Sequence, residues 1–150
     1  MIVIDPGKNG AIVKCTMIEG PLQRQWKYEA HRMPKTECDI VELIKSLRGE
    51  DEVEQCYIEK VSAMPGNGVT SMFSFGRNYG LLRGAIIASG YVLNEVTPKS
   101  WQKNIVPANL EKAERKNAIK QYVQQRLPGE KVTLYTADAL AMAIVLTRSE

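Results

Sequence analysis

Short runs of hydrophobic residues near the start of the chain predict β-strands separated by turns. The first run, residues 2–4, ends at Asp5-Pro6-Gly7, and Asn9-Gly10 just beyond it is the dipeptide most typical of a tight hairpin. Residues 11–15 then predict the returning strand, and residues 26–31 predict a third strand after a further turn. We therefore expect the chain to open with an antiparallel meander of three strands.

The segments that follow alternate between helical and strand patterns. Thr36 is a favourable residue to begin a helix, and Asp39 stands three positions later, as in a capping box. Hydrophobic residues follow at helical spacing as far as Gly49. Residues 56–59 form a short apolar run typical of a buried strand, and residues 70–89 predict a long second helix.

The last part of the chain predicts one more strand and two more helices. Residues 91–96 predict the strand, and Asn109 is a good N-cap residue from which we expect a helix to begin. Thr136 can cap a last helix over residues 137–146. Strands that alternate with helices extend a hairpin sheet in parallel, because parallel strands need a crossover connection. The pattern predicts an α/β fold whose mixed sheet has three antiparallel strands followed by parallel strands, flanked by helices.

The composition is typical of a globular protein. Of the 150 residues, 44% are hydrophobic and 25% are charged, which are ordinary values for a globular domain. No apolar run approaches the roughly 20 residues that span a bilayer, and the first residues lack the pattern of a signal peptide. We see no internal repeat or linker. We therefore expect one domain over residues 1–150, located in the cytoplasm and without a membrane partner.

The few cysteines and the single histidine of the chain limit the kinds of metal site that the protein can form. Cys15, Cys38 and Cys56 are widely spaced and form no CxxC pair, which argues against a disulfide framework or a thiolate zinc site. His31 is the only histidine and lies in a predicted strand, where a structural role is the simpler interpretation. A metal site would therefore be built from oxygen ligands, which suit Mg²⁺ or Mn²⁺.

Three acidic residues lie where an apolar element begins or ends. Asp5 and Glu59 each end a predicted strand, and Asp138 lies in the first turn of the last predicted helix. Acids that are buried together repel one another and raise one another's pKa unless a metal ion neutralises them. A shared magnesium site would explain all three positions.

Each acid also has a simpler interpretation. Asp5 could belong to an ordinary turn, Glu59 could pair with Lys60 or a distant arginine, and Asp138 could complement the positive end of its helix. Periodicity alone does not show that the three acids converge.

The motifs around the three acids follow one another in a fixed order. They are Ile4-Asp5-Pro6-Gly7 followed by Gly10-Ala11, then Ile58-Glu59, then Ala137-Asp138-Ala139-Leu140-Ala141. Together they resemble the RuvC family of Holliday junction resolvases, which belongs to the RNase H-like superfamily. Residues 59–76, EKVSAMPGNGVTSMFSFG, and residues 96–101, VTPKSW, resemble the phage-encoded branch of that family. The resemblance extends from Ile2 to Ala143.

The resemblance implies an RNase H-like fold, a homodimer and an endonuclease that acts in DNA recombination and repair. Its substrate would be four-way junctions and other branched DNA, cut by paired nicks. Two Mg²⁺ ions, or Mn²⁺ as a substitute, would lie about 3.5–4 Å apart. Asp5 would bridge both ions, Glu59 would hold one and Asp138 the other. Lys60 or Lys116 could support the charge that develops on the phosphate.

The family has a fourth metal ligand, Asp or His, a few residues before the last one. The corresponding positions here are Thr133, Leu134, Tyr135 and Thr136. A threonine hydroxyl could bind weakly or through water, or Glu130 or Glu114 could complete the site. The departure leaves open a non-cleaving junction-binding protein with the same fold and an incomplete metal site. An actin-like kinase does not fit, because that fold needs two such domains.

Basic residues predict where DNA would bind. The net charge of +3 and the pI of about 8.7 permit a nucleic-acid partner without deciding for one. Three lysines at every fourth position from residue 112 form a ridge that suits phosphate contacts, although a solvated face is the alternative. We expect DNA contacts from Lys60, Phe73, Arg77, Lys99, Trp101, Lys103, Lys112, Lys116 and Lys120.

Small residues recur at every fourth position of the long predicted helix. They are Gly76, Gly80, Gly84 and Ala88. Each glycine inside a helix costs roughly 1 kcal/mol relative to alanine, so the stripe needs a cause. Close packing onto the sheet or another helix is the expectation, and the close approach of DNA or of a dimer mate is the alternative. We expect Phe75 in the core, whereas Phe73 could equally fill the core or stack on unpaired bases.

Overall fold

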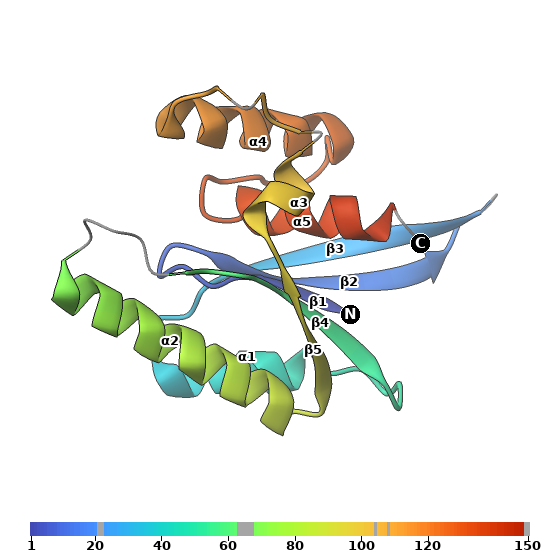
Figure 1. Cartoon of the computed structure of the whole chain (residues 1–150). Helices are drawn as coiled ribbons and strands as arrows, with labels where there is room; N and C mark the ends of the chain where they lie inside the picture. The colour runs from blue at the N-terminus through green and yellow to red at the C-terminus, as the bar shows by residue number, and fades with distance from the viewer. Residues whose placement is uncertain (21–22, 63–67, 104, 108, 149–150) are drawn as a thin grey trace.

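A five-stranded sheet runs through the centre of the molecule (Figure 1). The computed structural model describes residues 1–20, 23–62, 68–103, 105–107 and 109–148, so most of the glycine-rich loop after Glu59 lies outside the described residues. The sheet order is β3-β2-β1-β4-β5. The strands are β1 (Ile2–Asp5), β2 (Ala11–Glu19), β3 (Arg24–Arg32), β4 (Glu54–Glu59) and β5 (Tyr91–Val96).

The pairing of the strands is the one that the sequence predicts. Strand β2 is antiparallel to both β1 and β3, whereas β4 is parallel to both β1 and β5. The parallel pairs are those joined through helices, and the antiparallel pairs are those joined by turns. The prediction of a mixed five-stranded sheet is confirmed.

Helices cover both faces of the sheet (Figure 1). One face carries α1 (Glu37–Ser46) and α2 (Val69–Ala88). The other carries α3 (Pro98–Gln102), α4 (Lys112–Arg126) and α5 (Ala137–Thr147). Helix α5 lies against the sheet, and α4 packs on the outer side of α5. Among the described residues, no helix is long and apolar enough to cross a membrane.

Strand β1 is buried on both sides, and its alternating side chains enter two separate cores. Ile2 and Ile4 pack in the core beneath α1 and α2, whereas Val3 packs in the core beneath α5. Because side chains alternate along a strand, Asp5 at the end of β1 belongs to the side that faces α5. The burial pattern therefore decides on which face the acid lies.

The structure differs from the sequence prediction at the start of one helix and in the presence of one additional short helix. The helix expected from Asn109 begins at Lys112 instead, because a capping box between Glu111 and Glu114 starts it there. The short helix α3 was not predicted; Thr97 caps it by accepting a hydrogen bond from the Ser100 backbone N–H at 3.2 Å. Thr36 caps α1 as predicted, with the Asp39 N–H donating to its hydroxyl at 3.1 Å.

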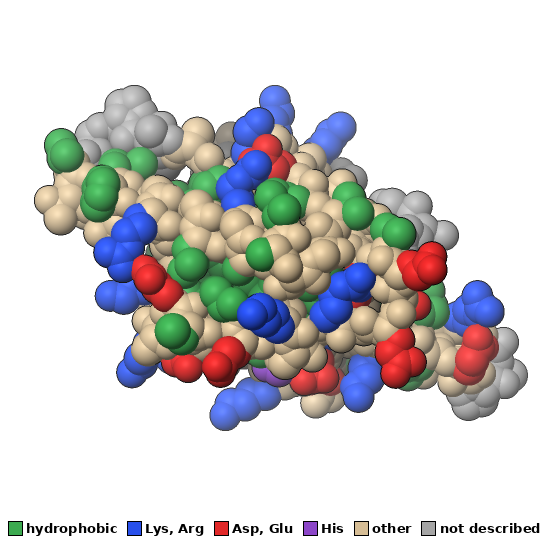
Figure 2. Space-filling model, turned by 90° about the horizontal axis from the view of Figure 1, so that it is seen from below, with side chains coloured by type: hydrophobic (Ala, Val, Ile, Leu, Met, Phe, Trp, Pro, Cys, Tyr) green, Lys and Arg blue, Asp and Glu red, His purple; other side chains and the backbone are tan. Residues whose placement is uncertain are grey.

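The small-residue stripe of α2 faces away from the protein. Gly76, Gly80, Gly84 and Ala88 are exposed, and a Cβ atom added at any of the three glycines would meet no atom within 4 Å. The expectation that the stripe packs onto the sheet or another helix is therefore wrong for the described chain. Hydrophobic and basic side chains are interspersed on the molecular face formed by α1 and α2 (Figure 2).

The two phenylalanines of α2 also lie outside the core. The Phe73 side chain is 73% exposed, and Phe75 is half-buried at the edge of a groove rather than in the core where we expected it. The outward stripe and the exposed phenylalanine ring leave this face of α2 without a covering element among the described residues.

Candidate active site

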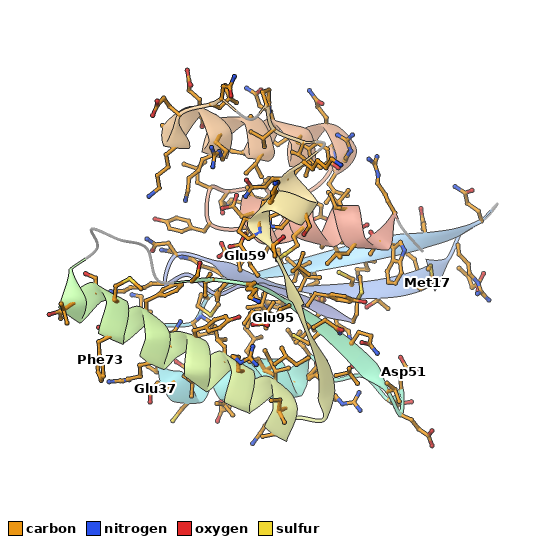
Figure 3. All side chains as sticks on the ribbon, in the orientation of Figure 1. Met17, Glu37, Asp51, Glu59, Phe73 and Glu95 are labelled. Carbon is orange, nitrogen blue, oxygen red and sulfur yellow. The ribbon has the colours of Figure 1, made fainter. Side chains whose placement is uncertain are left out.

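Asp5, Glu59 and Asp138 lie together at one end of the sheet, on the side of α5. Asp5 and Glu59 end the neighbouring parallel strands β1 and β4, one residue beyond the paired residues Ile4 and Ile58. Asp138 lies in the first turn of α5, the helix that packs on this face. Figure 3 shows Glu59 in the space between the sheet and helices α3 and α5.

Burial raises the affinity of all three carboxyl groups for protons, and neighbouring acids add to the effect at Asp5 and Glu59. Burial raises the pKa of Asp5 to about 6, and the charge of Asp138 adds to that effect. Burial likewise raises the pKa of Glu59 to about 7, with contributions from the charges of Asp5 and Asp138. The pKa of Asp138 is also raised by burial. These shifts show that the three acids are close enough to interact and are poorly solvated.

This group lacks an ion-pair partner in the part of the chain that the structure describes. Among the described residues, no lysine or arginine lies within ion-pair distance of Asp5, Glu59 or Asp138. Buried carboxylates without a paired cation are costly, and carboxylate oxygens are the ligands that Mg²⁺ and Mn²⁺ prefer. The donor set therefore fits a hard divalent cation. Among the described residues, no three His, Cys, Asp or Glu side chains lie close enough together to hold one metal ion, so the three acids interact through their charges without forming a ready three-ligand site.

Lys116 on α4 is the cation whose charge reaches this group. It is half-buried, and it lowers the pKa values of both Asp5 and Asp138, against the larger effect of burial. The other two lysines of the predicted ridge differ in exposure: Lys112 is exposed and Lys120 is half-buried. Helix α4 thus presents one lysine of the ridge toward the acids.

Trp101 supports the site from within the core. Its side chain is 2% exposed, and its indole Nε1–H donates a hydrogen bond to Glu59 Oε1 at 2.9 Å. We expected Trp101 to contact DNA, and this placement corrects that expectation, because a buried ring does not reach a nucleic acid. Trp101 instead contacts one of the three acids of the site through its indole N–H.

Two further residues hold the turn that carries Asp5. A Cβ atom at Gly10 would lie 2.2 Å from the Asp5 carbonyl oxygen and 2.9 Å from Asp5 Cγ, so only glycine allows β2 to begin so close to the acid. Asn78 on α2 donates to the Pro6 carbonyl oxygen at 3.2 Å. The Gly7 N–H donates to Asp5 Oδ1 at 3.2 Å. The sequence suggested Gly10 through the motif but contained no signal for Asn78.

The side chains of residues 133–136, among which the resemblance to RuvC led us to look for a fourth metal ligand, make other interactions. The hydroxyl oxygens of Thr133 and Thr136 lie 3.2 Å apart, and the Thr133 backbone N–H donates to the Thr136 hydroxyl at 3.1 Å. The Arg32 guanidinium carbon lies 3.6 Å from the centre of the Tyr135 ring. Glu114 accepts a hydrogen bond in the capping box of α4. The two threonine hydroxyls therefore bond to each other, and an arginine covers the tyrosine.

The remaining predicted DNA-binding residues lie on the surface. Lys99 and Lys103 are exposed beside α3, and the Lys60 side chain is 57% exposed with its Nζ 4.0 Å from Glu95 Oε2. Arg77 is also exposed, but its Nε donates to Glu37 Oε1 at 3.0 Å. Two of these four cations, Lys60 and Arg77, thus already lie beside an acid of the protein.

No protein-family model and no curated protein matches the chain. A solved structure of Thermus thermophilus RuvC aligns with a TM-score of 0.55 at 18% sequence identity, over 97% of this chain and 92% of that one. The chain has the fold of RuvC. A second structure, RuvC of the same organism in complex with a Holliday junction substrate, aligns with a TM-score of 0.56 at 16% identity over the same shares of the two chains.

Proposed function

We propose that this protein is a metal-dependent endonuclease that cuts four-way and other branched DNA by paired nicks. The observation that supports it most is the group of three half-buried carboxylates at the ends of β1 and β4 and the start of α5, none of which has an ion-pair partner among the described residues. The RuvC fold supports the proposal, since one structure with that fold holds a Holliday junction substrate. Residues 59–76 support assignment to a phage-encoded branch that acts as one nuclease domain in the cytoplasm of the host cell.

The carboxylates would hold the metal ions of this reaction. The charges of Asp5 and Asp138 act on Glu59, and that of Asp138 acts on Asp5. By the resemblance to RuvC, Asp5 would be shared by two Mg²⁺ ions, with Glu59 and Asp138 each holding one of them. Bound divalent ions supply an activated water and stabilise the leaving oxygen in phosphodiester hydrolysis. Trp101 keeps Glu59 Oε1 in one orientation through its N–H, and Lys116 contributes positive charge where a phosphate would lie.

Surface cations around the acids would position the DNA backbone. Lys60, Lys99, Lys103, Lys112 and Lys120 lie on elements that surround the site, and phosphate contacts of this kind position a duplex without reading its sequence. Arg77 is available to DNA only when its ion pair with Glu37 opens. Phe73, with its exposed ring, is the aromatic residue placed to stack on an unpaired base.

The outward face of α2 would form the interface of a homodimer. Val69 and Ile87 are 87% and 60% exposed, and they lie on the same side of the helix as the exposed glycine stripe. Because glycine has no Cβ atom, an exposed apolar helix face that carries glycines allows the backbones of two helices to approach closely. Gly80→Leu should lower the mass measured by size-exclusion chromatography with light scattering, whereas Gly80→Ala should keep the dimer. An unchanged mass for both variants would count against this interface.

Incubation of a labelled four-way junction with the protein and Mg²⁺ or Mn²⁺ tests the activity. Paired nicks that disappear in EDTA and in Asp5→Asn are the expected result. A non-cleaving junction-binding protein is the second candidate function, favoured by the Arg32–Tyr135 stack at the position of the fourth ligand. Junction binding without nicking in either metal would establish that second function, and the absence of both would refute both.

A further inference from the structure

Two grooves meet at Arg32, the last residue of β3. The first groove has a volume of about 870 Å³ and lies between the β1–β2 turn, the segment before α1 and the start of α2; Lys8, Arg32 and Lys35 are among its lining residues. The second has a volume of about 670 Å³ and lies beside the segment before α5; Arg32, Lys120 and Lys131 are among its lining residues. Both grooves thus carry cations and share one arginine.

The charges in these grooves favour an anionic occupant. The first groove contains one acid, Glu37, whose Oε1 accepts a hydrogen bond from Arg77 and which is therefore already compensated. The second contains one acid, Glu130, beside three cations. Phe73 and Met33 add apolar surface to the first groove. A groove that combines cations with an aromatic ring suits a strand with phosphates and bases.

Arg32 is free to bind an anion. Among the described residues its side chain forms no ion pair and no hydrogen bond, and that side chain stacks on the Tyr135 ring, whose centre lies 3.6 Å from the guanidinium carbon. Stacking on an aromatic face holds the guanidinium plane and leaves its N–H donors available. A planar fork of N–H donors matches the oxygens of a phosphate.

The sheet places Arg32 near the acids. Asp5 pairs with Ala11 across β1 and β2, and Ala11 pairs with Arg32 across β2 and β3. Residues paired in this way project on the same side of a sheet, and two strand spacings separate the Asp5 and Arg32 backbones by about 10 Å. That separation is comparable with the distance between phosphates one or two nucleotides apart along a strand.

We propose that Arg32, held by Tyr135, binds a DNA phosphate next to the cleavage position, and that the same strand continues into the two grooves along Lys8 and Lys35 on one side and Lys120 and Lys131 on the other. This inference rests on the proposed function and adds a strand path that passes around the end of β3. The path uses the tyrosine at the position where related nucleases have a metal ligand. The tyrosine acts as a positioning residue for the arginine.

Binding of a fluorescently labelled four-way junction, measured by anisotropy in EDTA over a range of salt concentrations, tests the strand path. Arg32→Gln should weaken binding about tenfold and reduce the slope of log K against log salt by about 0.9, the value for one lost phosphate contact. Arg32→Lys should restore part of the slope, because it keeps the charge without the planar fork. Tyr135→Ala should weaken binding less than Arg32→Gln.

Arg24→Gln is the matched control, since Arg24 lies at the other end of β3 and pairs with Glu19 at 2.9 Å. It should leave both affinity and slope unchanged. The strand path alone would be overturned if the wild-type protein binds the junction and Arg32→Gln, with an unaltered melting temperature, binds it with the same affinity and the same salt slope. A wild-type protein that binds no junction would overturn the proposed function together with this inference.

Discussion

Strand β4 begins and ends with a glutamate, and the two residues have opposite surroundings. Glu54 at its start is 3% exposed and accepts hydrogen bonds from the Gly49 N–H at 2.7 Å and from Arg48 Nη1 at 3.3 Å. Lys14 Nζ also donates to it, and the amino group of Met1 lies 3.2 Å away. Burial raises its pKa, but these partners outweigh burial and lower the pKa to about 2.

Glu59 at the other end of the strand has no such compensation. Its hydrogen-bond partner is the Trp101 N–H, and its neighbours Asp5 and Asp138 are themselves acids, so that burial and like charge raise its pKa to about 7. The same residue type on the same strand is therefore neutralised by the protein at one end and left without a cation at the other. A buried acid that the fold does not neutralise indicates a site for an external cation.

Loss of an acid at the unpaired end should have the largest effect. Asp5→Asn removes a ligand worth several kcal/mol of charge stabilisation, so nicking should fall by about 10³-fold. In EDTA at pH 8 the variant should be more stable than wild type by about 1–3 kcal/mol, because the carboxylate with a raised pKa destabilises the fold above that pKa. Rate assays and urea unfolding measure both.

The stability gain of Asp5→Asn should vanish near pH 3, where the wild-type carboxyl is protonated in both the folded and the unfolded state. Asp51→Asn, an exposed acid in the loop before β4 (Figure 3), should change neither quantity. An Asp5→Asn protein that is less stable than wild type at pH 8 would contradict the conclusion that the ionised Asp5 carboxylate destabilises the fold.

Loss of the acid at the neutralised end should act on stability alone. Glu54→Gln leaves Lys14 and Arg48 without their partner and should destabilise the fold by about 3 kcal/mol at pH 7. Because the pKa of Glu54 is lowered, its stabilisation is complete above about pH 4.5 and is lost as pH falls toward 2. The difference between variant and wild type should shrink over that range in urea unfolding, with nicking per folded molecule unchanged.

Glu50→Gln, at an exposed position near the start of β4, is the control for this loss and should be neutral. A Glu54→Gln protein that is as stable as wild type would show that Glu54 does not stabilise the fold. A folded Glu54→Gln protein that loses nicking would show that Glu54 does not act on stability alone.

Removing the hydrogen bond to Glu59 should have a smaller effect. Trp101→Phe deletes the N–H donor while keeping an aromatic ring, and the concentration of Mg²⁺ needed for half-maximal nicking should rise by about tenfold. Titration of activity with metal at fixed DNA measures this shift. Trp26→Phe serves as the control, since Trp26 packs against the same core on β3. Equal metal dependence of both variants and wild type would exclude an orienting role for Trp101.

Removing Lys116, whose charge acts on Asp5 and Asp138, should have the smallest effect. Lys116→Gln should destabilise the protein by less than about 1 kcal/mol at pH 8 in EDTA, because its charge lowers the pKa values of Asp5 and Asp138. The loss should be smaller in an Asp5→Asn background, which a double-mutant cycle measures. Lys112→Gln, one turn earlier and exposed, should show no coupling. Equal coupling for both lysines would show that Lys116 has no special relation to the acids.

The order and type of the main elements could be predicted from the sequence because their signals are local. Alternation of apolar residues marks the strands, and the Asn9-Gly10 turn joins the first two of them. The helix start at Asn109 was predicted wrongly for a local reason as well: two candidate caps compete within three residues, and the reciprocal bonds of Glu111 and Glu114 favour the later one.

By itself, the sequence determined the succession of strands and helices along the chain, a mixed sheet, and three acids at the ends of apolar elements. Only the tertiary structure decided that these acids share one face, that Trp101 is buried against Glu59 and that the glycine stripe of α2 faces outward. It alone placed Arg32 on Tyr135, which is 103 positions away in the chain. The physical reason is that periodicity and capping depend on neighbours in the chain, whereas burial and charge compensation depend on which distant segments meet.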